Sequence, residues 1–175
     1  MTKYIRKEQI EKLQQQFPNL VFDAEQEKPA VYVQADELLA VLQYVKEQVS
    51  FSFDRMSNLT AVDYKDYFEM VYHLFSRRYY TWLTIKVKLE HDAPEIPSVT
   101  PLWEGANFEE REVYDLMGVN FTGHPDLRRI LMPDNYGAHP LRKDFEPLEP
   151  KIEGGVLTWQ KQNQQPILQY LVTKT

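Results

Sequence analysis

Residues 80–90 read Tyr-Thr-Trp-Leu-Thr-Ile-Lys-Val-Lys-Leu-Glu, and this stretch decides the class of the fold. Positions 83, 85, 87 and 89 are aliphatic, whereas positions 84, 86, 88 and 90 are polar. A period of two is typical of a β-strand, because successive side chains of a strand point to opposite faces. The pattern predicts a strand with one face on a hydrophobic core and one polar face.

The same alternation continues toward the N-terminus. Residues 59–64 and 67–75 are two further expected strands with a turn at residues 63–66, and residues 30–33 are a shorter candidate. Neighbouring strands joined by short turns pair in antiparallel orientation. We therefore expect an antiparallel meander of about three to four strands.

Two amphipathic helices precede the meander. Apolar residues recur at helical spacing in residues 6–17, which end before Pro18, and in residues 36–48. The expected buried stripe of the second helix comprises Leu38, Leu42, Val45 and Val49. Both helices can cover the apolar face of the meander. The predicted fold class is α+β, an antiparallel sheet covered on one face by helices, with a loop-rich C-terminal extension.

The chain is expected to divide near residue 145. Residues 1–145 form one α+β domain in this prediction, with prolines 94, 97 and 101 marking an irregular connector inside it. Residues 146–175 form a C-terminal docking tail. Apolar islands at 156–159 and 167–172 flank a glutamine-rich stretch there, too little for a separate core but suited to docking on another surface.

The composition excludes several classes of function. The chain has 175 residues, a formal net charge of -6 and no cysteine. Negative charge disfavours non-specific binding to nucleic acids and to anionic lipids. Without cysteine there are no disulfides, no thiolate nucleophiles and none of the usual ligands of iron–sulfur clusters. The sequence has no apolar run of about 20 residues and no signal peptide, so we expect a cytosolic chain or one attached through a partner.

An acidic helix is expected at residues 108–117. Asn107 and Glu110 suit an N-terminal capping box, and Gly118 suits the left-handed residue that often ends a helix. Val113, Leu116 and Met117 form its inward stripe. A well-capped surface helix explains much of this acidic cluster without any binding role.

A basic, proline-bounded segment follows the helix. Residues 127–131 and 139–145 combine arginine or lysine with apolar residues, and arginine suits bidentate pairing with carboxylates at interfaces. These arginines can pair with acids of the helix, as Arg111 can with Asp115 four residues on, or reach a partner; both can hold at once. The candidate partner interface comprises Glu110, Arg111, Glu112, Asp115, His124, Arg128, Arg129, Arg142, Lys143 and Phe145.

The two halves together carry a family resemblance. The runs Glu110-Arg111-Glu112, Asp115-Leu116-Met117-Gly118 and Gly123-His124-Pro125-Asp126-Leu127-Arg128-Arg129-Ile130-Leu131 resemble the signature of the 30-kDa subunit family of the proton-pumping NADH:quinone oxidoreductase, respiratory complex I. In bacteria this family is called the C subunit. His139-Pro140-Leu141-Arg142-Lys143-Asp144-Phe145 also resembles that family. The match is close over residues 104–145.

The resemblance implies a structural clamp without an active site or cofactor of its own. The 30-kDa subunit binds the large quinone-site subunit in the peripheral arm, beside small cluster-bearing subunits. Flavin and iron–sulfur clusters lie on those partners, and NAD and quinone are substrates of the whole complex. The resemblance also implies a peripheral position on the cytoplasmic side of the cell membrane, reached only through the complex, and no nucleic-acid partner.

Three alternatives stay open. The first is the equivalent subunit of a membrane-bound energy-converting hydrogenase or another donor-adapted relative of complex I. The second is a separate enzyme that uses Glu110, Glu112 and Asp115 as acid–base groups. The third is a binding module unrelated to respiration. None of the four histidines has the spacing of a helical zinc pair, so we expect structural roles for them.

Overall fold

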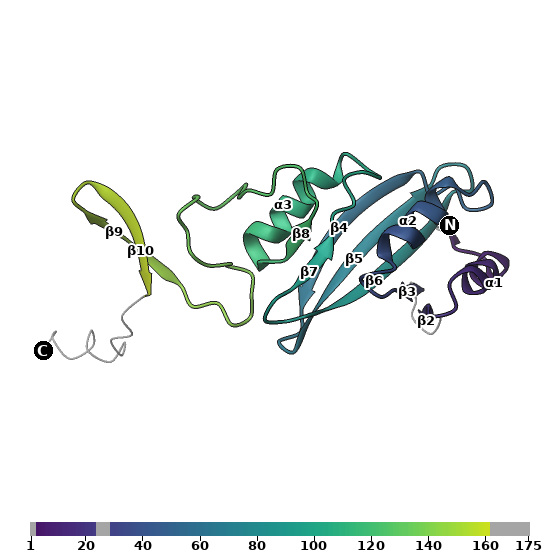
Figure 1. Cartoon of the computed structure of the whole chain (residues 1–175), viewed down its shortest axis with the longest axis horizontal. Coiled ribbons are helices and arrows are strands. Elements are labelled where there is room, and N and C mark those ends of the chain that lie inside the picture. The colour runs from purple at the N-terminus through teal and green to yellow at the C-terminus, as the bar shows by residue number, and fades with distance from the viewer. Residues whose placement is uncertain (1–2, 24–28, 162–175) are drawn as a thin grey trace, which may run out of the picture.

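The computed structural model describes residues 3–23 and 29–161 of the chain. Its centre is an antiparallel meander of β4 (Arg55–Asp63), β5 (Tyr67–Ser76) and β6 (Thr81–Glu90). Figure 1 shows these three long strands side by side. The alternating apolar positions of β5 and β6 are buried on one face, as predicted. The α+β class and the meander are confirmed.

The sheet extends beyond the meander on the β6 side. The strand order is β2-β3-β6-β5-β4, with β2 (Val21–Asp23) at one edge and β4 at the other. Both the short β1 (Lys3–Tyr4) and β3 (Ala30–Tyr32) pair with β6 in parallel, β1 at Thr81–Trp82 and β3 at residues 84–86. The candidate strand at 30–33 is therefore confirmed, and the sheet has more strands than the meander alone.

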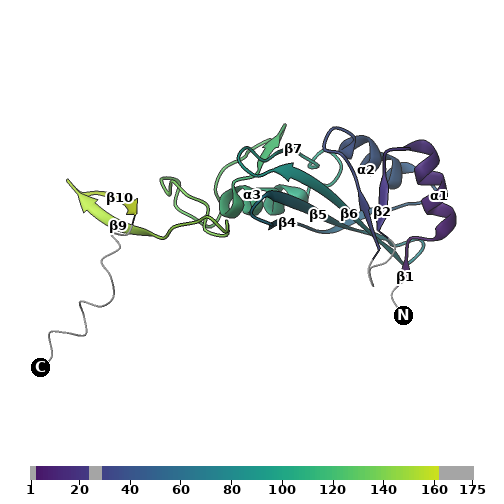
Figure 2. The same cartoon turned by 90° about the horizontal axis from the view of Figure 1, so that it is seen from below.

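Helix α2 (Leu38–Glu47) lies over the apolar face of the sheet, and α1 (Lys7–Gln16) lies at its end near the N-terminus (Figures 1 and 2). Leu38, Leu42 and Val45 are fully buried, as expected. The fourth member of the predicted stripe, Val49, is exposed, so that expectation is wrong. The physical reason is that α2 ends at Glu47, before the stripe reaches Val49.

The region after the meander is more ordered than an irregular connector. It contains a short strand, β7 (Glu95–Pro97), which follows Pro94 and ends at Pro97. Strand β7 pairs in parallel with β8 (Asn120–Thr122), and helix α3 (Ala106–Met117) lies between the two strands in the sequence. Helix α3 packs against the edge strand β4. Ile96, Val113 and Phe121 join the same hydrophobic core as the sheet.

A separate hairpin follows the domain. Strands β9 (Leu148–Glu153) and β10 (Val156–Lys161) form an antiparallel pair that lies away from the main sheet (Figure 1). It falls within the predicted docking tail, whose second apolar island at 167–172 lies outside the described residues. Among the described residues, no helix combines the length and hydrophobicity needed to span a membrane.

Candidate protein-binding surface

Helix α3 begins earlier than the sequence suggests. Its first residue is Ala106 and its N-cap is Gly105, with no side-chain capping bond. The capping box predicted for Asn107 and Glu110 is therefore wrong. The reason is that the Glu110 side chain does not turn back to the helix start but points into the core.

Glu110 is fully buried between α3 and the segment after β7. Its two carboxylate oxygens accept hydrogen bonds from the Ser98 hydroxyl and the Val99 N–H, both at 2.7 Å. Burial raises the pKa of Glu110 to about 7, although these two bonds oppose the shift. The two hydrogen bonds connect α3 to the segment after β7, and a carboxyl group this deep in the core cannot reach a partner.

His124 completes this buried group. Its Nε2 atom lies 4.0 Å from the Glu110 carboxylate, and its side chain is fully buried. The Asp126 N–H donates to Nδ1 at 3.0 Å, so the ring hydrogen sits on Nε2 and points to the Asn107 carbonyl at 3.3 Å. His124 thus has an internal role.

Asp115 anchors residues 124–145, which we call the strap, to α3. The buried Asp115 carboxylate accepts hydrogen bonds from three consecutive backbone N–H groups, those of Ile130, Leu131 and Met132, at 3.0, 2.7 and 2.8 Å. Arg129 donates to its other oxygen at 2.7 Å. Burial alone would raise the pKa of Asp115, but these donors outweigh it and lower the pKa. The carboxylate therefore stays ionised and fixes the strap.

Arg111 binds the strap and not Asp115, so the predicted pair between these two residues is wrong. Its guanidinium donates to the carbonyls of Arg128 and Arg129 at 3.1 and 3.2 Å. Arg129 is the residue that takes the carboxylate of Asp115. Helix α3 thus binds the strap through one positive side chain, Arg111, and one negative side chain, Asp115.

The strap crosses the end of α3 at Gly118. This glycine has the left-handed conformation predicted for it, with φ of 78°. The ring of His139 lies over it so closely that a Cβ atom there would be 2.7 Å from the ring. Next to this contact, the Leu141 N–H donates to the Leu116 carbonyl at 2.9 Å.

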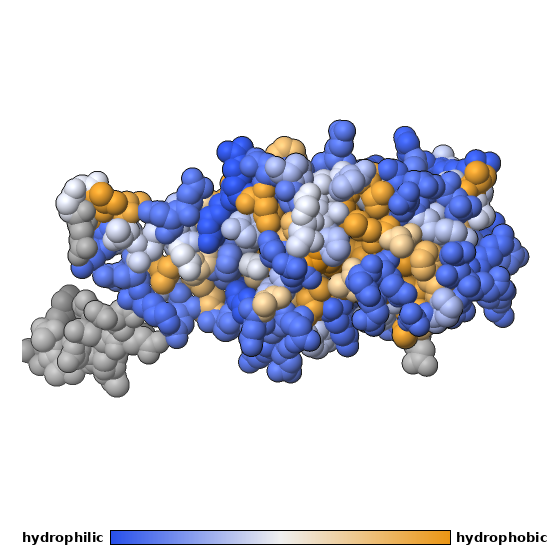
Figure 3. Space-filling model, in the orientation of Figure 1, coloured by the Kyte–Doolittle hydropathy of each residue, from blue (hydrophilic) through white to orange (hydrophobic). Residues whose placement is uncertain are grey.

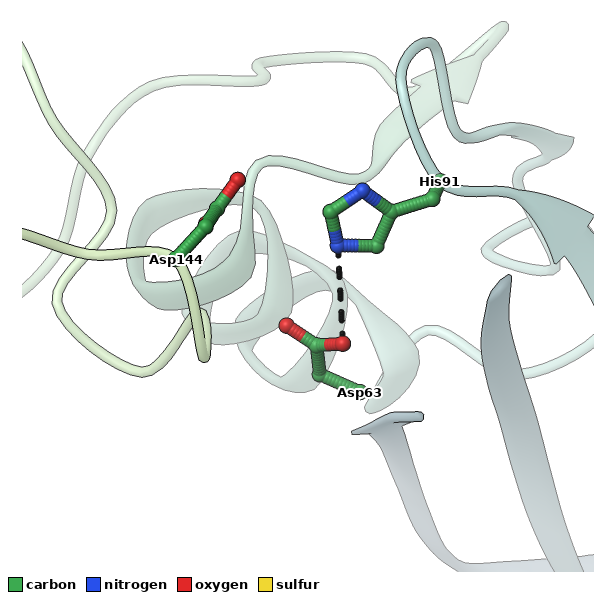
Figure 4. Close-up of side chains that lie close together, drawn as sticks. All are labelled: Asp63, His91 and Asp144. Carbon is green, nitrogen blue, oxygen red and sulfur yellow. Dashed lines mark ion pairs between the residues drawn. The ribbon is translucent and has the colours of Figure 1, made fainter. Parts of the chain in front are cut away.

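A charged cluster holds the far end of the strap (Figure 4). Arg142 binds both oxygens of Asp144 at 2.9 and 3.0 Å, and its guanidinium lies 5.2 Å from the centre of the Phe68 ring. The His91 ring stacks on Phe68 and lies 3.5 Å from Asp63. Asp63 also accepts the Lys143 N–H at 2.8 Å. The cluster thus ties the strap to the end of the meander.

Asp63, His91 and Asp144 each offer a ligand atom within 4.8 Å of the others, which raises the question of a metal ion. The chemistry of the group favours a structural ion-pair cluster with Arg142 over a metal site. Arg142 already occupies both Asp144 oxygens, and one of its nitrogens lies 3.3 Å from His91 Nδ1. The guanidinium supplies the positive charge that a cation would bring, and it would repel one.

The ten predicted interface residues therefore divide into two groups. Glu110, Asp115, His124, Arg111, Arg129 and Arg142 make internal contacts that build the surface. Glu112, Arg128, Lys143 and the half-buried Phe145 remain at or near the surface. The side chain of Arg128 contacts only Asp126, at 2.8 Å, among the described residues, and both side chains are largely exposed.

The sequence pattern did not single out the exposed apolar side chains of this surface. Phe108 on α3 and Leu131 and Leu141 on the strap are all exposed. Figure 3 shows hydrophobic surface next to hydrophilic surface in the region of α3. Leu131 and Leu141 lie within the basic segments 127–131 and 139–145, so the sequence does contain these apolar residues beside the arginines.

The hairpin β9–β10 adds a second apolar surface. By register, Leu148, Pro150 and Ile152 of β9 share one face with Leu157 and Trp159 of β10. Near the middle of this hairpin, on β10, Trp159 packs edge-on against Tyr136 and donates to Asn135 at 3.1 Å. At its tip, Ile152 is 75% exposed. The amphipathic hairpin is thus anchored through β10 and uncovered at Ile152 of β9.

The chain is similar to several known proteins. A family model for the 30-kDa subunit of the respiratory-chain NADH dehydrogenase matches residues 31–151. The C subunit of the NADH-quinone oxidoreductase of Moorella thermoacetica is 50% identical over 138 residues, 78% of this chain and 92% of the relative. A solved trypsin-resistant fragment of Nqo5 matches with a TM-score of 0.59 and 27% identity, covering 69% of this chain and 98% of the fragment. A chain of the membrane-bound sulfane sulfur reductase, an archaeal respiratory membrane complex, matches with a TM-score of 0.70 and 28% identity, covering 80% of this chain and 85% of its own.

Proposed function

Because the chain belongs to the family of the 30-kDa subunit of the respiratory-chain NADH dehydrogenase, we propose that it is a structural subunit of a proton-translocating NADH:quinone oxidoreductase. In this role it has no active site of its own and holds the large quinone-site subunit in the peripheral arm. Flavin and iron–sulfur clusters lie on partner subunits, in keeping with a chain that has no cysteine. Its place is peripheral, on the cytoplasmic side of the cell membrane.

The observation that supports a clamping role is the amphipathic hairpin β9–β10. A two-stranded hairpin is marginally stable by itself in water, and its apolar face needs a second surface to cover it. Strand β10 contacts Tyr136 and Asn135 through Trp159 and the Leu157 carbonyl, whereas the side chain of Ile152, near the tip on β9, is uncovered. We propose that this tip packs on the large quinone-site subunit, as an arm reaching out from the domain.

Two matched substitutions at the tip test this proposal. Ile152 and Val156 are both β-branched and largely exposed, at 75% and 61%, but they lie on opposite faces of the hairpin. Ile152→Ser should weaken association with the co-expressed large subunit about tenfold or more, because burying such a side chain contributes roughly 1.5–3 kcal/mol. Val156→Ser should change the measured affinity less than about twofold.

Neither variant should alter the free energy of unfolding of the isolated chain by more than about 0.5 kcal/mol, as is usual for exposed positions. Equal binding by the two variants and the unmodified chain would remove the hairpin from the interface. Native co-purification with identification of the bound subunits checks the wider assignment.

A second candidate is the equivalent subunit of a membrane-bound complex that uses a different electron donor. The match to a chain of the sulfane sulfur reductase, with a TM-score of 0.70, supports this reading, because that protein is a respiratory membrane complex. The same co-purification distinguishes the two, since the partner subunits include an NADH-oxidising module only in the first case.

A further inference from the structure

A shallow groove of about 100 Å³ separates helix α3 from the edge strand β4. Leu59, Val113 and Met117 are among the apolar residues that line it, and the exposed Leu141 of the strap forms one wall. Glu109 and Glu112 also line it. The groove thus has both apolar and polar lining, with two carboxyl groups on its α3 side.

The acidic side lacks a matching cation. Glu112 is exposed, and no lysine or arginine pairs with it among the described residues. Its negative charge acts on Glu109, whose pKa is raised mainly by burial and also by Glu112. Two carboxyl groups on the same side of a groove that also has apolar lining attract a segment that combines positive charge with an apolar side chain.

Beside this groove, the edge of β4 has a backbone N–H group that is already hydrogen-bonded. The Leu59 N–H donates to the Glu109 carboxylate, so this position of the strand edge is already satisfied. A partner is therefore received by side-chain contacts in the groove and not by adding a strand to β4.

We propose that the α3–β4 groove receives an apolar side chain of a partner protein segment in which lysine or arginine flanks that side chain. The occupant rests on the proposed function, in which the partner is the large quinone-site subunit. The geometry also explains why Glu112, alone among the acidic residues of α3 in the predicted interface, faces solvent.

A peptide titration of the full chain tests the groove without the large subunit. The probe is acetyl-Gly-Lys-Lys-Leu-Lys-Lys-Gly-amide, added to the ¹⁵N-labelled chain at low salt. The backbone amide signals of Asn58, Thr60 and Leu141 should shift. A peptide with serine in place of leucine should bind at least about threefold more weakly, and one with glutamate in place of lysine should not bind measurably.

The matched variants are Glu112→Lys and Glu104→Lys, which reverse one exposed charge inside and one outside the groove. Glu112→Lys should weaken binding of the lysine–leucine peptide about threefold to tenfold, and Glu104→Lys less than about twofold. Shifts elsewhere on the chain, or equal effects of the two variants, would overturn the proposal. Self-association of the chain that depends on Glu112 would overturn it in favour of a second copy.

This outcome is independent of the co-purification described above. A chain that binds the large subunit but not the peptide keeps the proposed function and loses the groove. A chain that binds the peptide at the groove but does not bind the large subunit keeps the groove as a binding site and loses the proposed function.

Discussion

Glu110 and Asp115 are both fully buried carboxylates of helix α3, yet their surroundings shift their pKa values in opposite directions. Asp115 has three backbone N–H donors and the charged Arg129, which together outweigh burial. Glu110 has only the neutral donors Ser98 and Val99, so burial dominates. One helix thus holds one group that stays ionised and another that titrates near neutral pH.

Glu110 makes the stability of the chain depend on pH. Its pKa rises from 4.5 to about 7 on folding. Below pH 4.5 both states bind the proton; as the pH rises toward 7 the unfolded state ionises first, so stability falls across this window. A pKa difference of about 2.5 corresponds to roughly 3 kcal/mol. Glu110→Gln should remove this loss, seen as an unfolding free energy in urea that no longer falls between pH 4.5 and 7.

The control for this measurement is Glu104→Gln, which changes an exposed carboxyl just before the same helix. Its unfolding curve should keep the pH dependence of the unmodified chain. A Glu110→Gln variant whose stability still fell over the same pH window would show that another group titrates there.

The end of helix α3 depends on two properties of Gly118. Its φ of 78° is costly for residues with a side chain, and the His139 ring leaves no room for a Cβ atom. Gly123 has the same φ, but no atom lies within 4 Å of the place that a Cβ atom would take. Gly118→Ala should therefore destabilise the chain by about 1 kcal/mol more than Gly123→Ala in thermal or urea unfolding.

Equal losses for the two glycine variants would mean that His139 moves aside without cost. In that case the losses of unfolding free energy from Gly118→Ala and His139→Ala should simply add in the double variant. A gain above that sum would instead confirm that the ring and the added methyl group collide.

The secondary structure elements that the sequence predicts best are the long ones. The alternation in β6 and the stripe in α2 extend over enough residues to fix their type. Strands β7 and β8 have three residues each, and prolines surround the first, so no periodicity reveals them. Helix α3 is predicted, but its start is misplaced, because the pattern favours Glu110 as a capping residue whereas the fold uses it in the core.

At the scale of the whole molecule, Arg142 joins the strap to the meander. Arg142→Ala removes the bidentate contact with Asp144 and the packing on Phe68. Because Asp144 also lies in the strap and is more than half exposed, that ion pair contributes at most about 1 kcal/mol. The lost contacts of Arg142 with Phe68 and His91 are the ones that should make the strap open more often. Hydrogen exchange of the Lys143 N–H, which binds Asp63, should become about tenfold faster.

Arg128→Ala is the comparison, because the side chain of this arginine lies on the exposed side of the strap and contacts only Asp126 among the described residues. It should leave the exchange rate of the Lys143 N–H unchanged. The sequence pattern treats Arg128 and Arg142 alike as interface residues. The fold separates them, so loss of partner binding in an Arg142 variant would report on the strap as well as on the interface.

The candidate surface was predictable in its location but not in its contacts. The basic, proline-bounded runs place it between α3 and the strap. Which arginines face inward depends on pairings such as Arg129 with Asp115. These two residues are 14 apart, too far for a local sequence pattern to reveal, and their pairing follows from the path of the strap. The apolar Leu141 could have been found, since it lies within the basic run around Arg142.

The bond between Lys143 and Asp63 also has a consequence for the order of folding. It joins residues 80 apart in the chain, whereas the bonds of Asp115 to the strap span only 14 to 17 residues. Closing a longer loop costs more conformational entropy, and synthesis releases the meander before the strap. We expect the contacts of the strap with Asp115 to form first and its contact with Asp63 to form last. A nascent chain therefore has its complete binding surface only after the core has formed.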